Sequence, residues 1–310
     1  METRQIGRLE VSVIGLGCNN FGMRIGEAET AEVVSAALDA GINYFDTADV
    51  YGQTRSEAFL GSALAGRRDE VVLATKFGGM GSPDGSLSGG HPDWVRQAVE
   101  DSLGRLGTDR IDHYQYHRPD PDVPLAETMG ALNDLVVEGK VLEVGCSNFD
   151  ASQIDDSAAI AAGEGWAPFR SVQNRFSVLH REPETGVIGA CRRHGLGLVP
   201  YFPLESGLLT GKVGPGGDVP DDSRLAMMPE DRRGRFLNDE RIAAVERLSS
   251  YAADHDRTLL ELAIGWLISE PIVATVIAGA TRPDQVHANA AAGGWRLTAD
   301  QRAEVATLAG

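Results

Sequence analysis

The sequence predicts an α/β fold of the (β/α)8 barrel type, the TIM barrel, in a single domain over residues 1–310. Eight short apolar runs with strand character recur along the chain, and amphipathic helical patterns lie between most of them. Strands that alternate with helices indicate a parallel sheet, because each crossover returns the chain to the same end of the sheet. Eight such units at this length favour a closed barrel, and a doubly wound open sheet is the alternative.

The predicted elements follow from short patterns. The strands, in order, are VSVIGLG, INYFD, VVLATK, IDHYQYH, VLEVG, SVQN, LGLVP and VATVIAG. The helix PDWVRQAVEDSLGRLG is stopped by its last residue, Gly107, and Pro124 suits the first turn of PLAETMGALNDLVVEGK. Another helix begins at Thr258, three residues before Glu261, which is the spacing of a capping box.

Three segments lie outside the bare barrel. Residues 3–13 are expected to form an N-terminal β-hairpin around Gly7. A Gly-, Asp-, Pro- and Arg-rich loop covers about 207–236, after the seventh strand, and an extra helix follows at about 239–254. Long loops in compact domains tend to be binding lids or disordered segments, and both alternatives apply to this one.

Composition narrows the class of protein. The formal charge of −17, from 45 acidic and 28 basic residues, disfavours binding to nucleic acids and anionic membranes, because like charges repel. No apolar run reaches the roughly 20 residues that span a bilayer, and the first residues are charged, so a cytoplasmic protein is expected. Cys18, Cys146 and Cys191 lack metal-ligand or redox spacing and are expected to be packing residues, and no metal site is predicted.

Four reactive side chains fall at the carboxyl ends of three consecutive predicted strands. Asp46 ends INYFD and is followed by Tyr51, Lys76 ends VVLATK, and His117 ends IDHYQYH. In a barrel these strand ends meet at one mouth, where reactive residues lie. Each residue alone has an ordinary explanation, as a turn residue, a packed aromatic, a snorkelling lysine or a loop histidine. Their joint placement predicts a catalytic group.

The chemistry of this group suits proton donation to a carbonyl. A free tyrosine has a pKa of about 10, and the Lys76 cation is expected to lower the pKa of Tyr51. Asp46 is expected to hold the lysine and offset its burial, and His117 to hydrogen-bond a carbonyl oxygen and orient it. In the absence of metal ligands or a Ser or Cys nucleophile, the set suits addition to a carbonyl by an attacker that a cofactor supplies.

Several motifs carry a family resemblance. FDTADVYG, ATKFG, DHYQYHRPDP, VGCSNF, PYFPLESGLLTGK and VIAGATRPDQVHAN, in this order, resemble those of the aldo-keto reductases over about residues 5–291. The resemblance implies a (β/α)8 barrel and the NAD(P)H-dependent interconversion of carbonyls and alcohols. It also implies that Asp46, Tyr51, Lys76 and His117 form the catalytic tetrad, with Tyr51 as the general acid.

The resemblance also implies a cofactor site, position by position. Ser147, Asn148 and Gln173 match the residues that hold the nicotinamide carboxamide, and Tyr201 matches the ring that stacks on the nicotinamide. The other matched cofactor positions are Gly17, Cys18, Asp46, Phe202, Leu204, Ser206, Gly207, Leu208, Lys212, Gly279, Thr281, Arg282, Gln285 and Asn289.

Two parts of this cofactor site are expected to bind phosphate groups of the cofactor. PLESGLLTGK is similar to the family's pyrophosphate loop, where Lys212 supplies a cation and Glu205 is expected to point away. Arg282 is placed to grip a 2′-phosphate, which favours NADP(H). NAD(H) is also a possible cofactor, because the family often has a basic residue at the position of Gly279 and an acidic residue at the position of Ala288.

The substrate pocket is expected to be lined by Tyr51 and His117 and by residues of the loops after the strands. These loop residues are Asn19, Asn20, Phe77, Arg118 and the loop from Gly207. The asparagines and Arg118 suit a polar carbonyl compound such as a sugar or an acid-bearing aldehyde, and the alternative is that they face water.

Two other functions are alternatives to the reductase. A regulatory module of the same fold would keep the nucleotide site but turn over slowly. A Schiff-base aldolase would use Lys76 as its nucleophile.

The opening stretch VSVIGLGCNNFG is a weak match to a dinucleotide-binding fingerprint, because Asn20 stands at the third glycine position. It is interpreted as the first barrel strand.

Overall fold

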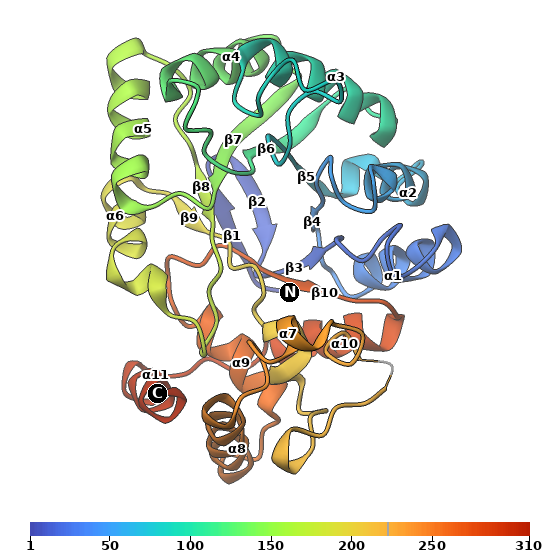
Figure 1. Ribbon diagram of the computed structural model, residues 1–310, viewed down its shortest axis with the longest axis vertical. Helices are drawn as coiled ribbons and strands as arrows, with labels where there is room; N and C mark the ends of the chain where they lie inside the picture. Colours follow the sequence, from blue (N-terminus) through green and yellow to red (C-terminus); the bar gives the residue numbers. More distant parts are fainter. Residues whose placement is uncertain (222) are drawn as a thin grey trace.

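Eight parallel strands form a curved sheet at the centre of the molecule, and helices surround it (Figure 1). The computed structural model describes residues 1–221 and 223–310. An isolated parallel bridge between Leu198 and Val273 joins the last strand of the sheet to the chain just before the first and completes the ring. The predicted (β/α)8 barrel is confirmed. In hydrogen-bonded order the strands are β10 (Val276–Gly279), β3 (Ile14–Gly17), β4 (Tyr44–Asp46), β5 (Val72–Phe77), β6 (Ile111–Tyr116), β7 (Val141–Ser147), β8 (Ser171–Gln173) and β9 (Gly197–Leu198).

The helices pack around the outside of this ring (Figure 1). Two predicted helix ends are confirmed: Gly107 ends α3 in the left-handed region, and Thr258 forms a capping box with Glu261 at the start of α9. Pro124 is the N-cap of α4 instead of a residue of its first turn. The helices are α1 (Glu27–Asp39), α2 (Arg55–Ala63), α3 (Pro92–Leu106), α4 (Leu125–Val137), α5 (Ala151–Glu164), α6 (Val187–His194), α7 (Glu230–Arg233), α8 (Asp239–Asp254), α9 (Leu259–Ile268), α10 (Pro283–Ala292) and α11 (Ala299–Ala309), with a 3-10 turn, η1 (Arg68–Glu70), before β5 and another, η2 (Glu182–Thr185), before α6.

The predicted N-terminal hairpin is formed by β1 (Thr3–Ile6) and β2 (Leu9–Ser12), which pair antiparallel. It divides the stretch VSVIGLG, which had been expected to form one strand: residues 11–12 belong to the hairpin, and the barrel strand starts at Ile14. Side chains of the hairpin pack with Tyr44 and Ala274, which lie at the amino ends of barrel strands. The hairpin therefore covers that end of the barrel, and the carboxyl ends of the strands face the opposite mouth.

The segment after β9 carries the additional elements that the sequence predicts. It contains two 3-10 turns, η3 (Glu205–Thr210) and η4 (Pro215–Gly217), followed by α7 and α8. The predicted helix over 239–254 coincides with α8, and position 222 of the predicted loop lies outside the described residues. Within the described residues, no helix is both long and apolar enough to cross a membrane.

The three cysteines take the role expected of them. Cys18, Cys146 and Cys191 are buried and free. Burial raises the pKa of both the Cys18 and the Cys146 thiol, which favours the unreactive protonated form.

Candidate active site

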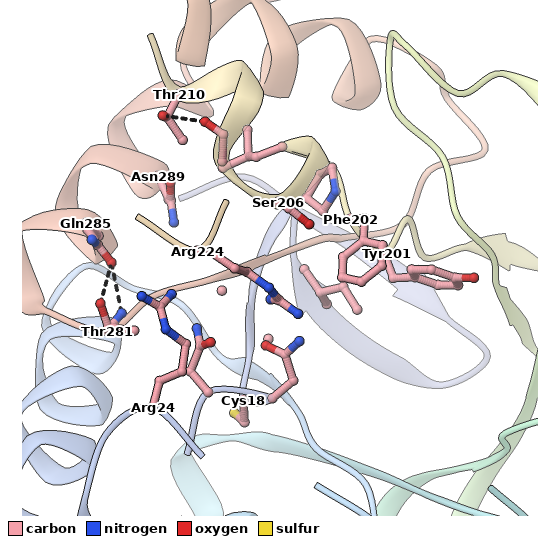
Figure 2. A pocket seen from close by; sticks show the side chains of 18 of the residues that line it. Cys18, Arg24, Tyr201, Phe202, Ser206, Thr210, Arg224, Thr281, Gln285 and Asn289 are labelled. Atoms are coloured by element: carbon pink, nitrogen blue, oxygen red, sulfur yellow. Dashed lines mark hydrogen bonds between the residues drawn. The ribbon is translucent and has the colours of Figure 1, made fainter. Parts of the chain in front are cut away.

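The carboxyl ends of the barrel strands surround a cavity of about 620 Å³. Loops that follow β3, β4, β6, β7 and β10 contribute to its wall, together with the last residue of β8 and the segment after β9. Figure 2 shows part of this wall. Asp46, Tyr51 and His117 line this cavity, and Lys76 lies behind them, fully buried. The barrel topology thus brings the four predicted catalytic side chains to one place.

The contacts within this group centre on the Lys76 ammonium. Nζ of Lys76 donates to Asp46 Oδ2 at 2.7 Å and to the Thr47 carbonyl at 2.7 Å, and it lies 3.4 Å from the Tyr51 hydroxyl. The Lys76 and Asp46 side chains are 0% and 2% exposed. The Tyr51 and His117 rings meet edge to face, with centroids 5.9 Å apart. The Tyr51 hydroxyl therefore has a buried cation on one side and the cavity on the other.

The expected lowering of the Tyr51 pKa is wrong. Burial raises the pKa of Tyr51, and the Lys76 charge, which acts in the opposite direction, offsets only part of that effect. Burial by itself lowers the pKa of Lys76, but the Asp46 carboxylate and Tyr51 together raise it above its usual value. Tyr51 therefore keeps its proton at neutral pH and Lys76 keeps its charge. Such a phenol donates its proton only when negative charge develops on a neighbouring oxygen.

His117 is neutral at physiological pH. Burial, with the charges of Lys76 and Arg118, lowers the pKa of His117 to about 3. Its Nδ1 atom is buried and has no hydrogen-bond partner in the part of the chain that is described, which favours the tautomer with the proton on Nε2, because a buried unpaired N–H is costly. The backbone is fixed from both sides: the His117 N–H donates to the Phe77 carbonyl at 2.8 Å, and Asn148 donates to the His117 carbonyl at 2.9 Å.

Sequence reasoning missed one polar neighbour of the tetrad, Gln115. Its Nε2 donates to Asp46 Oδ1 at 3.0 Å, and Gln173 Nε2 donates to the same oxygen at 2.8 Å and to Gln115 Oε1 at 3.1 Å. With Lys76 on Oδ2, both oxygens of the buried carboxylate are satisfied. The signal was present in the sequence, since His113 and Gln115 in β6 and His117 just after it occupy alternate positions, which point to the same face of the sheet.

The residues expected to hold the nicotinamide carboxamide form a connected network. Asn148 Nδ2 donates to Ser147 Oγ at 3.1 Å, and Asn148 Oδ1 accepts from the Tyr201 hydroxyl at 2.8 Å. Asn148 itself is in the left-handed region at φ 61°, which asparagine tolerates better than most residues. The second amide, on Gln173, has its nitrogen engaged by Asp46 and Gln115, so its oxygen is the atom left to accept from a ligand N–H.

The predicted pyrophosphate loop corresponds to η3 and the residues around it. Ser206 and Gly207 adopt positive φ values of 60° and 105°, and the buried Ser206 Oγ has no hydrogen-bond partner among the residues described. Ser206, Gly207 and Lys212 line the cavity, whereas Leu208 is buried and does not. As expected, Glu205 turns away: it is fully buried and pairs with Arg175 and with the α8 residue Arg241. An unpaired hydroxyl and a cation in this position fit an anionic phosphate.

The end of the cavity that is expected to hold the adenosine is built by the start of α10. The Thr281 hydroxyl and N–H both donate to Gln285 Oε1, at 3.2 and 2.9 Å (Figure 2). Arg282 donates to Asp284 at 3.1 and 3.3 Å, and both side chains are more than half exposed. Asp284 also lines the cavity and was not predicted. All other predicted cofactor positions, except Leu208, line it as well.

Most of the residues expected on the substrate side line the cavity, and their role stays a prediction. Asn19, Asn20 and Arg118 line the cavity. Phe77 does not, because it is fully buried and stacks on Tyr114 and Tyr116, with ring centroids 4.8 and 5.1 Å away. Two further arginines, Arg24 after β3 and Arg224 after β9, were not predicted, and they point into the cavity in Figure 2.

The sequence is similar to a family model and to several known proteins. The model of the Aldo/keto reductase family matches residues 13–309. The chain is 35% identical to "Probable aldo-keto reductase 1" of Glycine max, over 88% of this chain and 78% of the relative. It is 32% identical to "Aldo-keto reductase YhdN" of Bacillus subtilis (strain 168), over 97% of this chain and 90% of the relative. It is also 34% identical to "Probable voltage-gated potassium channel subunit beta" of Arabidopsis thaliana over 93% and 90%.

Proposed function

Because the chain belongs to the aldo/keto reductase family, we propose that it reduces an aldehyde or ketone to the alcohol with NADPH, with Tyr51 as the general acid. The observation that carries the proposal is the Tyr51 hydroxyl, which lies 3.4 Å from the buried Lys76 ammonium at the wall of the cavity. The neutral His117 ring lies beside Tyr51 and lines the same cavity. In this proposal the two groups bind the same carbonyl oxygen.

The four tetrad residues have distinct roles in this reaction. The nicotinamide cofactor supplies a hydride to the carbonyl carbon when it is bound. His117 donates a hydrogen bond from Nε2 to the carbonyl oxygen and orients it. Tyr51 gives its proton to that oxygen as negative charge develops there, and the Lys76 charge stabilises the phenolate that is left. Asp46, held by Lys76 and two glutamine amides, keeps the buried ammonium in place.

The cofactor lies, in this proposal, along the predicted positions. Ser147, Asn148 and the Gln173 oxygen would hold the carboxamide, and Tyr201 would stack on the nicotinamide ring. Ser206 and the backbone of η3 would hold the pyrophosphate. The rest of the wall would contact the adenosine and the ribose next to the nicotinamide. The further contacts are Gly17, Cys18, Asp46, Phe202, Leu204, Gly207, Lys212, Gly279, Thr281, Arg282, Gln285 and Asn289.

The preference for NADP(H) rests on Arg282, whose guanidinium is suited to a 2′-phosphate. The adjacent Asp284 carboxylate pairs with Arg282, would repel such a phosphate, and is able to accept from a ribose hydroxyl. NADH is therefore expected as a second, weaker cofactor. A comparison of kcat/KM for NADPH and NADH in the wild type and in Arg282→Ala measures this: the substitution should reduce the NADPH value only.

A second candidate function is a regulatory module that binds the cofactor but turns over slowly. The favouring observation is the likeness to proteins named as potassium channel β subunits. Steady-state NADPH oxidation with a panel of small aldehydes and ketones separates the two functions. Turnover above about 1 s⁻¹ for any member of the panel, in the ordinary range for enzymes, supports the reductase. NADPH binding without turnover across the panel supports the regulatory module.

The Schiff-base aldolase is the least supported alternative. A nucleophilic lysine must be a neutral amine, which requires a lowered pKa. The pKa of Lys76 is instead raised by Asp46 and Tyr51 despite burial. Borohydride treatment in the presence of a carbonyl compound is therefore expected to leave Lys76 unmodified, as measured by peptide mass spectrometry.

A further inference from the structure

Arg118 lies on the substrate side of the cavity, next to the residue that orients the carbonyl. We propose that Arg118 forms an anion subsite, so that the preferred substrates are aldehydes or ketones that carry a carboxylate on the same short skeleton. This inference rests on the proposed reductase function and names its substrate class. Arg118 follows His117 directly in the chain and lines the same cavity.

The backbone that carries Arg118 is fixed on both sides. His117 is held by hydrogen bonds to Phe77 and from Asn148, and the Asp120 N–H donates to the Tyr116 hydroxyl at 2.8 Å. The Tyr116 ring stacks on Phe77 with an interplanar angle of 5°. The backbone at Arg118 is thus held at a defined place beside the carbonyl site, and the residue is exposed.

The Arg118 guanidinium has no hydrogen-bond or ion-pair partner within residues 1–221 and 223–310. The carboxylate nearest in sequence, Asp120, is turned away, because its two oxygens accept from the backbone N–H groups of Gly90 and Asp122, at 2.9 and 3.0 Å. Among the described residues, no carboxylate therefore neutralises the Arg118 charge. Its charge acts toward the cavity, since it contributes to the low pKa of His117.

The charge of the whole molecule makes such a subsite necessary for an anionic substrate. A net charge of −17 repels anions at long range, so a local cation has to provide the attraction. Arg24 and Arg224 line the same cavity, and Arg224 lies 5.3 Å above the Phe202 ring, so they add positive charge to its wall. The planar guanidinium of Arg118 matches a carboxylate with two parallel hydrogen bonds.

The test compares substrates that differ only in charge. 4-Formylbenzoate and its neutral isostere 4-formylbenzamide are assayed with NADPH in the wild type, Arg118→Gln and Arg118→Lys. We expect kcat/KM to be at least tenfold higher for the acid in the wild type, and this ratio to fall to within about threefold of one in Arg118→Gln, with Arg118→Lys between them. Arg96→Gln, on the outer helix α3 and paired with Asp134, removes the same charge and should keep the wild-type ratio.

Three results would overturn the proposal. The first is a wild-type ratio near one, and the second is an unchanged ratio in Arg118→Gln. The third is a larger Arg118-dependent ratio for glyceraldehyde 3-phosphate over glyceraldehyde, which would assign the subsite to a phosphate.

A readout without turnover separates this inference from the reductase function. 4-Carbamoylbenzoate and benzene-1,4-dicarboxamide carry an unreactive amide in place of the aldehyde, and their binding to the NADPH-loaded protein is followed by the fluorescence of the bound cofactor. Binding of the acid at least tenfold tighter, lost in Arg118→Gln, supports the subsite even when no aldehyde is reduced. Equal binding of the two compounds contradicts the subsite, whatever the turnover.

Discussion

Gly79 determines where the His117 imidazole lies. A Cβ atom at position 79 would come 2.9 Å from His117 Nδ1, a distance that forces the ring or the loop to move. Gly79→Ala is expected to lower kcat/KM for carbonyl reduction about tenfold, or about 1.4 kcal/mol, because the Nε2 hydrogen bond to the carbonyl is then misaligned.

Steady-state kinetics measure this loss, and a matched glycine controls for it. Gly104 lies in α3 with open space at its Cβ position, so Gly104→Ala should leave kcat/KM unchanged and raise the free energy of unfolding by about 1 kcal/mol. Wild-type kcat/KM in Gly79→Ala would show that the position of His117 is not set by this contact.

Gln115 acts as a positioning residue, because it touches Asp46 and Gln173 but does not line the cavity. In Gln115→Met the carboxylate loses one donor and a Gln173 hydrogen is left unpaired, so we expect kcat to fall about tenfold with little change in the KM of the carbonyl. Gln115→Glu gives a signature that a merely structural role does not. Its activity should recover as the pH falls, since only a protonated carboxyl can donate to Asp46. A pH-independent defect in Gln115→Glu contradicts this role.

At the residue scale, the sequence was sufficient to predict that the four residues of the tetrad lie together. It was not sufficient to predict the direction of the Tyr51 pKa shift. The placement of Asp46, Lys76 and His117 at strand ends follows from topology alone. The direction of the Tyr51 pKa shift depends on whether burial or the Lys76 charge is larger, and burial is larger. That balance is a property of the folded environment, which the local pattern does not contain.

At the scale of elements, the connection from β4 to α2 contains a carboxyl group that titrates near neutral pH. Asp49 is 8% exposed, and its Oδ1 atom has no partner among the described residues. Burial, with the Glu57 charge, raises the pKa of Asp49 from its ordinary value of 3.8 to about 7. The folded state therefore binds this proton more tightly than the unfolded state, so the contribution of Asp49 to stability falls as the pH rises from about 4 to about 7.

Asp49→Asn removes this pH dependence while keeping the shape of the side chain. Its gain in unfolding free energy over the wild type should grow by about 1.4 kcal/mol per pH unit between pH 4 and 7 and level off above that range. Denaturant unfolding of both proteins at several pH values measures the gain. A gain that does not change with pH would mean that Asp49 is ionised in the folded protein throughout.

The ends of the helices and strands show why local sequence patterns predict only part of the fold. Helix caps such as Thr258 with Glu261 are local and were predicted. The break between β2 and β3 was not predicted, because it depends on hydrogen bonds between Ser12 and Asn43, which are distant in the sequence. The run LGLVP was expected to form a full strand, but β9 is limited to Gly197–Leu198. Contacts between distant segments decide these limits.

At the scale of the whole molecule, Arg4 ties the N-terminal hairpin to the far end of the chain. Its guanidinium donates to the carbonyls of Ile268, Glu270 and Val273, at 2.6, 3.2 and 2.5 Å. Arg4→Ala is expected to lower the free energy of unfolding by about 2–3 kcal/mol, since charged donors to three buried carbonyls are lost. The kinetics should not change, because the hairpin lies at the end of the barrel opposite the cavity.

Denaturant unfolding and kinetics check both halves of this expectation. The exposed Arg96, which pairs with Asp134 on the surface, provides the control: Arg96→Ala should change the free energy of unfolding by no more than about 1 kcal/mol. Equal destabilisation by the two substitutions would mean that the Arg4 contacts do not hold the ring closed. The count of β/α units predicted the barrel, but this long-range closure has no local signal in the sequence.

The central claim is that Tyr51 protonates the carbonyl oxygen, and Tyr51→Phe tests it most directly. Cofactor affinity is measured by titrating NADPH fluorescence, and chemistry by single-turnover reduction of 4-formylbenzamide with saturating protein. We expect NADPH to bind as in the wild type while the rate of reduction falls by about 10²–10⁴, the usual contribution of a general acid. An unchanged rate in Tyr51→Phe would contradict the assignment of Tyr51 as the acid.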